Sequence, residues 1–326
     1  MKQQNLAEIS RVSGKSVSTV SKVLRGCGGV TAETREAVLN AAGEYPVGVR
    51  HSDSDEIFVI LPDNPKYFWH RACAVLKESP HPITLKLFSA IRQEQGEALV
   101  EEYIEQAVAA NVRALIVAAH GNERTQNRLA ELANQMLVIQ LCEYTPISNT
   151  FFVGGDGRAD GRALASCIPT DSDRPLNIGV MTGAISHAGA QRIEGFLSAL
   201  PPTARVFFVE KPTAVELYAS HLARAIDALG VSLDYFFSFD GITTAACDAL
   251  YKLRGKMTAQ LLGFEYPTTA EKHMEAGRIA ALAVQAPDQQ MRLALALAER
   301  YVRERLYPPQ KYCYVPSEIL VGKGAL

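Results

Sequence analysis

From Ile57 onward, short apolar runs alternate with longer amphipathic stretches, and this alternation constrains the fold more than any other feature. Such runs are typical of strands buried on both faces, and the stretches between them are typical of helices. The runs are Ile57–Leu61, Ile83–Phe88, Ala114–Ala118, Leu137–Leu141, Phe151–Val153, Ile178–Met181, Val206–Val209, Tyr235–Phe239, Leu261–Phe264 and Ile279–Val284. The helix-like stretches include Gly96–Asn111, Glu123–Gln135, His187–Leu200, Val215–Leu229 and Gln289–Arg305. Strand–helix alternation predicts an α/β fold with parallel sheets, and so many strands favour two doubly wound lobes over one sheet.

Residues 1–45 follow a different pattern, that of a small all-α unit. We expect two helices joined by a tight turn at Gly14, a unit that places its second helix in the DNA major groove. Asn5 and Glu8 form the pattern of a capping box at the start of the first helix. The apolar residues expected on the inward faces are Leu6, Ile9 and Val12 of the first helix and Val20, Val23 and Leu24 of the second.

The second helix also carries the residue types that contact DNA. Val17, Ser18 and Lys22 are expected to point outward, where an apolar side chain suits a thymine methyl group and a lysine reaches guanine acceptors. A phosphate-neutralising role for Lys22 stays open at this point. The short hydroxyl side chains expected to bond phosphate oxygens are Ser16, Thr19 and Ser21.

The segment from Ala7 to Leu24 resembles the DNA-binding head of the lactose/galactose-repressor (LacI/GalR) family. Residues 30–42 resemble the third helix of that head, with Thr31 as its N-cap, a further expected DNA contact, and Glu33 in its first turn. In the body, the segments that resemble the family are residues 57–68, 153–161, 192–200, 262–265, 307–309 and 315–320.

The resemblance implies a periplasmic-binding-protein-like body. It implies a helix-turn-helix domain over residues 1–45, a linker over 46–56 and a two-lobed effector-binding and dimerisation domain over 57–326. The chain would cross between the lobes near 156–160, 284–288 and 309–313, and a small ligand would lie between them. The partners implied are double-stranded operator DNA, a carbohydrate or carbohydrate derivative, and a second copy of the chain.

Charge is distributed unevenly along the chain, whose formal net charge is −2. Residues 1–50 hold seven Lys or Arg against four acids, so this part is basic and the remainder is acidic. A basic head on an acidic body suits a protein that docks on DNA through one end. The six cysteines show no metal-ligand spacing, and no apolar run reaches transmembrane length. We therefore expect a cytoplasmic protein with reduced thiols and no metal, cofactor or membrane partner.

The linker departs from the family pattern. Family members carry a longer linker in which a leucine wedges into the minor groove, whereas residues 45–53 here contain no leucine. Either Val47 or Val49 replaces that leucine weakly, or the protein does not kink its operator in this way.

Seven body residues are the expected ligand contacts: Tyr67, Phe68, Trp69, Asp156, Arg192, Phe239 and Glu265. Aromatic rings stack on the apolar face of a sugar, and a guanidinium or carboxylate orients its hydroxyl groups. Each has a plainer alternative: core packing for the three neighbouring aromatics, a turn or cap role for Asp156 and Glu265, and an ion pair between lobes for Arg192. Phe239 stands where the family commonly has asparagine, and Asp240 after it is expected to cap a helix starting at Gly241.

Three other functions compete with a ligand-controlled DNA-binding regulator. An enzyme is disfavoured because the glycines near Asp156 lack nucleotide-binding spacing and no nucleophile elbow or Walker motif occurs. A transport receptor is disfavoured by the helix-turn-helix pattern and by an N-terminus that lacks signal-peptide character. A ligand-sensing homologue whose short linker has weakened DNA binding stays open.

Overall fold

The chain is described from a computed structural model. The described residues are 3–24, 30, 31, 33–35, 37, 38, 41, 55–63, 67–89, 93–118, 122–170, 174–183, 186–212, 217–255, 258–266 and 269–322. The body forms two compact units, and the chain passes between them after Gly154, Ala286 and Tyr314. The second of these positions lies within the expected range 284–288, and the other two lie just outside 156–160 and 309–313.

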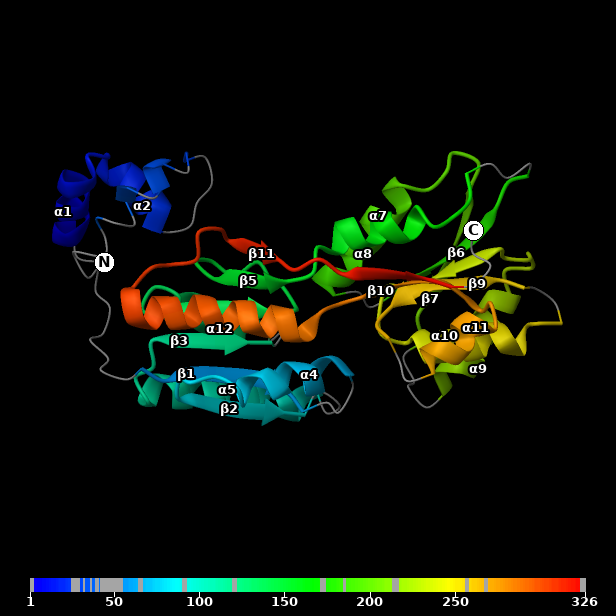
Figure 1. Ribbon diagram of the computed structural model, residues 1–326, viewed down its shortest axis with the longest axis horizontal. Coiled ribbons are helices and arrows are strands. Elements are labelled where there is room, and N and C mark those ends of the chain that lie inside the picture. Colours follow the sequence, from blue (N-terminus) through cyan, green and yellow to red (C-terminus); the bar gives the residue numbers. More distant parts are fainter. Residues whose placement is uncertain are drawn as a thin grey trace. The chain divides into compact units, whose positions relative to one another are not determined.

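The first unit is built on a six-stranded parallel sheet in the order β11-β5-β4-β3-β1-β2 (Figure 1). Its strands are β1 (Ile57–Pro62), β2 (Ile83–Phe88), β3 (Ala114–Val117), β4 (Leu137–Leu141), β5 (Phe151–Gly154) and β11 (Tyr312–Tyr314). Every residue of β1 is buried, as expected for a central strand covered on both faces. The strand order reverses between β1 and β3, where open α/β sheets bind ligands beyond their carboxyl ends.

Four helices cover the first sheet: α4 (Tyr67–Leu76), α5 (Gln93–Ala109), α6 (Glu123–Leu132) and α12 (Pro287–Glu304). Right-handed crossovers that run in opposite directions along a sheet put their helices on opposite faces, so α4 and α5 lie on different faces. Helix α12 packs on α4, and α6 packs near α5. Pro287 suits the first turn of α12, where its missing N–H costs no helix bond.

The second unit repeats the same strand order with other strands: β12-β10-β9-β8-β6-β7. Its strands are β6 (Asn177–Thr182), β7 (Arg205–Glu210), β8 (Tyr235–Phe237), β9 (Gln260–Phe264), β10 (Ile279–Val284) and β12 (Glu318–Val321). All neighbours are parallel except β12, which runs antiparallel to β10. The reversal point lies between β6 and β8.

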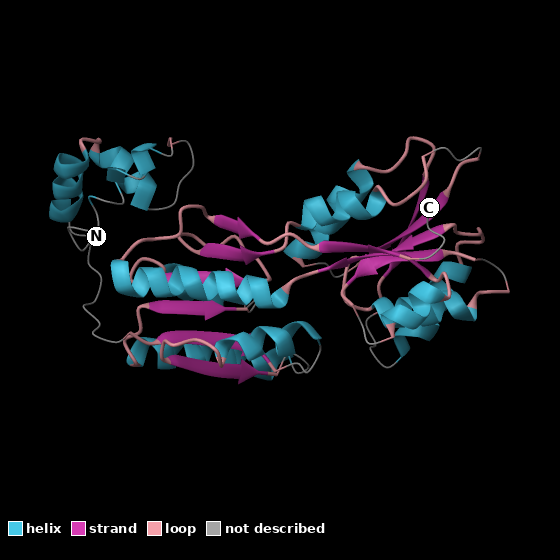
Figure 2. Ribbon diagram, viewed as in Figure 1, coloured by secondary structure: helices cyan, strands magenta, loops and turns pink. Residues whose placement is uncertain are grey.

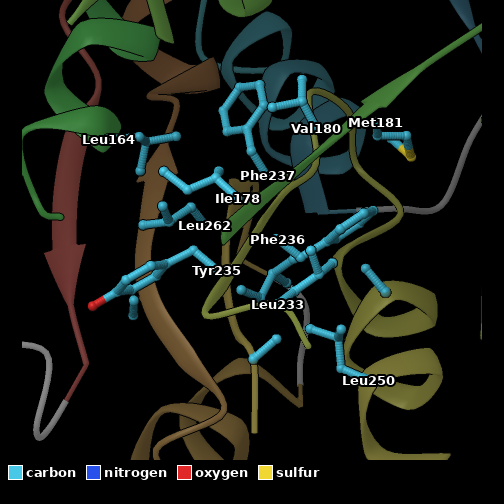
Figure 3. Close-up of a cluster of buried hydrophobic side chains, with 14 of the residues drawn as sticks. Leu164, Ile178, Val180, Met181, Leu233, Tyr235, Phe236, Phe237, Leu250 and Leu262 are labelled. Carbon is cyan, nitrogen blue, oxygen red and sulfur yellow. The ribbon is translucent and has the colours of Figure 1, made fainter. Parts of the chain in front are cut away.

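Five helices cover the second sheet: α7 (Gly157–Ala165), α8 (His187–Ser198), α9 (Tyr218–Asp227), α10 (Thr243–Lys252) and α11 (Ala270–Glu275). Figure 2 shows α7 and α8 together on one face and α9, α10 and α11 on the other. The core between them is apolar and includes Ile178, Val180, Phe236, Phe237 and Leu262 (Figure 3). The predicted α/β class and its two doubly wound lobes are thus confirmed.

Candidate functional site: the DNA-binding head and the carboxyl edge of the second sheet

The head is held by a small apolar core. Helices α1 (Gln3–Ser13) and α2 (Val17–Leu24) bury Ile9, Val20 and Val23, which pack with Val38 and Ala41 of the third helical stretch. The prediction that Val12 faces inward is wrong, because Val12 is 40% exposed and is not part of this core. Steps of three residues drift by about 60° each around a helix, so Val12 lies about 120° away from Leu6. The side chains of Asn5, Glu8 and Leu24 lie outside the described residues.

The turn between the two helices is fixed by local geometry. Gly14 has a φ of +65°, a conformation that suits glycine, so the expected pivot is confirmed. The hydroxyl of Ser10 donates to the carbonyl of Lys15 (2.6 Å) across this turn. The backbone N–H of Thr19 donates to the Oγ of Ser16 (3.2 Å), so Ser16 caps α2. The start of α2 is therefore set before any DNA is bound.

The residues expected to contact DNA lie on the outer face of α2. Val17 is 44% exposed, and Ser18 and Lys22 are also exposed. The Oγ of Ser16 lies 2.9 Å from that of Ser18 and 2.8 Å from the Oγ1 of Thr19, which gathers three hydroxyl groups at the helix N-terminus. Ser21 is half-buried on the next turn. Exposed hydroxyls at a helix N-terminus are suited to a phosphate.

Thr31 caps the third helical stretch, as predicted. The N–H of Thr34 donates to the Oγ1 of Thr31 (3.2 Å), and the N–H of Arg35 donates to the carbonyl of Thr31 (2.9 Å). The contact of Thr31 with DNA stays a prediction.

In the second unit, three expected ligand residues gather at the carboxyl edge of the sheet. Phe239 and Glu265 follow β8 and β9, and Arg192 reaches the same edge from α8. Nη1 of Arg192 donates to the carbonyl of Phe239 (3.0 Å), and the guanidinium carbon lies 4.1 Å from the ring centre of Phe264. The Nε of Arg192 is buried and has no hydrogen-bond partner in the described part of the chain. A buried donor without a partner is a candidate for ligand contact.

Phe239 takes part through its backbone. Its side chain is only 2% exposed and packs in the core of the second unit. Its carbonyl, and not its ring, therefore contacts Arg192 at the carboxyl edge of the sheet. The burial of this ring depends on tertiary packing, which the sequence alone did not show.

Glu265 is held in an unusual conformation. Its φ is +68°, a region that a non-glycine residue adopts at an energetic cost and that recurs at active sites and ligand contacts. Its Oε1 accepts from the Nε2 of Gln285 (2.7 Å), which directly follows β10. The carboxylate is therefore oriented by the residue that directly follows a neighbouring strand. Glu265 lies in a bend after β9, so the alternative of a turn role stays open, and its contact with a ligand stays a prediction.

Asp156 has the cap role that was the alternative to ligand binding, because it caps α7 through a hydrogen bond from the N–H of Ala159 to its Oδ1 (3.0 Å).

The prediction that Asp240 caps a helix starting at Gly241 is wrong. Helix α10 begins at Thr243, and no side chain caps it. Asp240 instead accepts from the N–H of Ile242 (3.3 Å) and pairs with the Nζ of Lys211 (2.5 Å). The ion pair with Lys211, which directly follows β7, competes with a capping role for the Asp240 carboxylate.

Asp160 is a polar residue of this unit that the sequence did not single out. It is 6% exposed, and its Oδ2 accepts from the Oγ of Ser317 (2.9 Å). A Cβ placed at Gly155 would lie 3.3 Å from that Oδ2 and 3.4 Å from the Oε1 of Gln285. Burial raises the pKa of the Asp160 carboxyl above its ordinary value, and the bond from Ser317 opposes this shift.

Asp160→Asn should raise the free energy of unfolding at neutral pH, by about 0.5–2 kcal/mol. A carboxyl whose pKa is raised in the folded state stabilises the fold most when protonated, and that stability is lost as the pH rises from its ordinary pKa through the folded one. The variant has no such loss. Thermal unfolding of both proteins between pH 4 and pH 7 should give a difference that grows with pH, and a constant difference would contradict the assignment.

Helices α7 and α8 approach closely because each has a glycine at the contact. A Cβ at Gly195 would lie 2.2 Å from the carbonyl oxygen of Arg158, and one at Gly161 would lie 2.1 Å from that of Arg192. Any larger residue would push the two helices apart and move Arg192.

Gly195→Ala should destabilise the second unit by about 1–3 kcal/mol, because the added methyl group overlaps backbone that cannot yield without helix movement. Urea unfolding measures this effect. Gly255→Ala is the matched control, since a Cβ at Gly255 meets nothing within 4 Å. Equal stability of the two variants would show that the α7–α8 contact is looser than described.

The aromatic candidates lie in the first unit, at the start of α4. Phe68 is buried and meets Trp69 edge-on, with ring centres 4.8 Å apart, and Trp69 is half-buried. Packing therefore explains Phe68, whereas Trp69 keeps an exposed part. The side chain of Tyr67 lies outside the described residues.

The described residues also bear on metal, membrane and disulfide chemistry. Within the described ranges, no three His, Cys, Asp or Glu side chains are grouped as a metal site would require. No described helix is both long enough and apolar enough to cross a membrane. No disulfide joins the five described cysteines, and burial raises the pKa of Cys247 to about 12.

Comparison with known proteins identifies both parts of the chain. Residues 5–45 match the family described as bacterial regulatory proteins, lacI family, and residues 58–305 match the periplasmic binding protein domain. The chain belongs to the LacI family of regulators, with a periplasmic-binding-protein body. This LacI-family protein is therefore a DNA-binding regulator, and the family is not an enzymatic one. No curated protein sequence matches it significantly.

Solved structures share the fold of this LacI-family protein. A LacI-family transcriptional regulator from Silicibacter pomeroyi is 19% identical over 98% of each chain, with a TM-score of 0.61. The glucose-galactose binding protein GanP from Geobacillus stearothermophilus is 16% identical over 84% of this chain and 99% of its own, with a TM-score of 0.69. A solute binding protein from Actinobacillus succinogenes with bound D-allose is 16% identical over 83% and 98%, with a TM-score of 0.68.

Proposed function

We propose that this LacI-family protein is a repressor whose affinity for an operator is controlled by a small sugar or sugar derivative bound between its two lobes. The observation that carries the DNA-binding half of the proposal is the outer face of α2, where Val17, Ser18 and Lys22 are exposed above a packed core. Ligand changes lobe closure, which changes the spacing of two heads on DNA. Because operator DNA lies in the cytoplasm, the protein acts there.

The ligand class is supported by the carboxyl edge of the second sheet. Arg192, with its unpartnered Nε, and the strained Glu265 present a donor and an acceptor of the kind that orient hydroxyl groups. Similar structures are named for glucose, galactose and D-allose, so these three sugars begin the panel to be tested. Isothermal calorimetry should find one binder among them or among their phosphorylated and acidic derivatives.

A homodimer is part of the proposal, because one three-helix head contacts too little DNA for specificity. Exposed apolar side chains on the edge strands support it: Leu85 and Leu87 on β2, and Phe208 on β7. Edge strands with exposed apolar residues favour association. Sedimentation at micromolar concentration should give twice the chain mass of 35.5 kDa, and a mass of one chain would exclude the dimer.

The deciding experiment is capture of fragmented genomic DNA by the purified protein at physiological salt, followed by sequencing. Enrichment of one or a few near-palindromic sites is the expected result. Salt-sensitive binding without enrichment would overturn sequence-specific repression, because phosphate contacts alone give binding of that kind.

A second candidate function rests on the linker. Residues 45–53 have no leucine to enter the minor groove, which favours a ligand-sensing protein with weakened DNA binding. This segment lies outside the described residues. The two candidates differ in one measurement: the repressor binds its captured site more tightly than random DNA at physiological salt, and the weakened homologue does not.

A further inference from the structure

Helix α12 runs from a point where the chain enters the first unit to a contact with the linker, residues 46–56 (Figure 1). It begins at Pro287, directly after the chain passes between the units at Ala286, and it ends at Glu304. Its 18 residues span about 27 Å at about 1.5 Å per residue. The contacts at its two ends therefore decide which parts of the molecule it connects.

The N-terminal end of α12 is joined to an expected sugar contact. Gln285 lies between β10 and α12, and its Nε2 donates to the Oε1 of Glu265 (2.7 Å). Glu265 is the acceptor that the proposed function places against the sugar. Two peptide bonds connect Gln285 to Pro287, the first residue of α12. A displacement of the Glu265 carboxylate therefore reaches α12 through one hydrogen bond and two peptide bonds.

The C-terminal end of α12 is joined to the linker by one arginine. Arg113 directly precedes β3, and its Nη1 donates both to the carbonyl of Val302 in the last turn of α12 (3.1 Å) and to the Oδ1 of Asp55 in the linker (3.3 Å). The last carbonyls of a helix have no partner inside it, so Val302 is free to accept this bond. The side chain of Arg113 is only 17% exposed, whereas that of Asp55 is 66% exposed. Arg113 is thus fixed in the body and holds an exposed residue of the linker.

Between these ends, α12 is joined along its length to α4 and to the turn that follows α4. Three polar pairs make this connection: Arg71–Asp288 (3.2 Å), Glu78–Arg292 (2.7 Å) and Ser79–Glu299 (3.2 Å). The buried face of α12 also packs on β3, β4 and β5. A helix supported in this way moves as one body and does not bend between its ends.

We propose that α12 carries the effect of sugar binding to the linker, and that Arg113 is the positioning residue that holds the linker to the helix. The inference rests on the proposed function, because it names the route by which a sugar at Glu265 changes operator affinity. Strand β1 also adjoins the linker, but the chain does not pass between the units next to β1. Helix α12 adjoins both the passage at Ala286 and the Arg113 contact.

The test measures the factor by which a sugar changes the operator affinity of the full chain. The sugar is the tightest binder found by calorimetry among glucose, galactose, D-allose and their derivatives, and the DNA is the captured operator. In Arg113→Met this factor should fall about threefold, as expected for the loss of a partly exposed ion pair. Sugar affinity without DNA should stay within about twofold of the parent, because Arg113 makes no contact with the expected sugar residues.

Asp55→Ala separates the linker contact from the stability of α12. It removes the acceptor in the linker and leaves the bond from Arg113 to Val302, so the free energy of unfolding should change little. The factor should nevertheless fall as it does in Arg113→Met. The double variant should show no loss beyond that of Arg113→Met, because both changes remove the same contact. A full sugar response in either single variant overturns the proposal.

Arg124→Met is the matched control, because Arg124 is another arginine of the first unit and pairs with Glu101 (3.4 Å), away from α12. Its sugar response should equal that of the parent, and an equal loss in this control would overturn the proposal. The parent itself separates the two levels of inference. If no sugar of the panel changes its operator affinity, the proposed function fails and this route fails with it. If the parent responds and both linker-contact variants respond equally well, the route alone is overturned.

Discussion

A protein with Val17, Ser18 and Lys22 all changed to alanine is expected to bind its captured operator at least about 100-fold more weakly. Each good contact with a base edge contributes about 1–3 kcal/mol, and about 1.4 kcal/mol corresponds to a factor of ten. The three side chains lie on the exposed face of α2 and contribute nothing to the core of Ile9, Val20 and Val23. Anisotropy titration of operator and random duplexes at one fixed salt concentration measures the loss.

The matched control changes Val321, Ser232 and Lys272 to alanine. These are also one exposed valine, one exposed serine and one exposed lysine, and they lie in the body. Operator affinity should be unchanged in this control, and both variants should keep the far-ultraviolet circular dichroism of the parent. If the head variant kept its preference for operator over random DNA, base recognition by α2 would be contradicted.

Much of the fold could be predicted because its signals are local. The apolar runs at Ile57–Leu61 and Ile279–Val284 gave central strands, and Gly14 gave the turn of the head. The short strands β11 and β12 were not predicted, because three or four residues with mixed polarity show no period. Each is positioned by pairing with a strand distant in sequence, β5 and β10 respectively.

The candidate site could be predicted only as a set of residues. Arg192 and Glu265 were found from the resemblance, but the buried Nε of Arg192 and the positive φ of Glu265 depend on tertiary contacts. The same holds for the partners Gln285 and Lys211, which are ordinary polar residues in the sequence. Their one local signal is that each directly or closely follows a strand, where parallel sheets place functional residues.

Arg192→Met is expected to weaken binding of the sugar selected by calorimetry about 100-fold or more. Methionine keeps the apolar stem over the ring of Phe264 but removes every donor of the guanidinium, including the Nη1 bonded to the Phe239 carbonyl. A hydrogen bond from a charged donor contributes about 1.5–3 kcal/mol, so the loss of one or two suffices for this effect. Calorimetry with the same sugar measures it.

Arg174→Met is the control, because Arg174 lies at the opposite edge of the same sheet, where it pairs with Asp234 (2.5 and 3.0 Å). The change of charge and side chain is identical, and sugar affinity should be unaffected.

Thermodynamic linkage gives a second measurement. If the sugar changes operator affinity by a given factor, the operator must change sugar affinity by the same factor. Arg192→Met should therefore bind the operator as the sugar-free parent does, with no response to sugar at the concentrations that shift the parent. A variant that keeps the full response would place the effector away from Arg192.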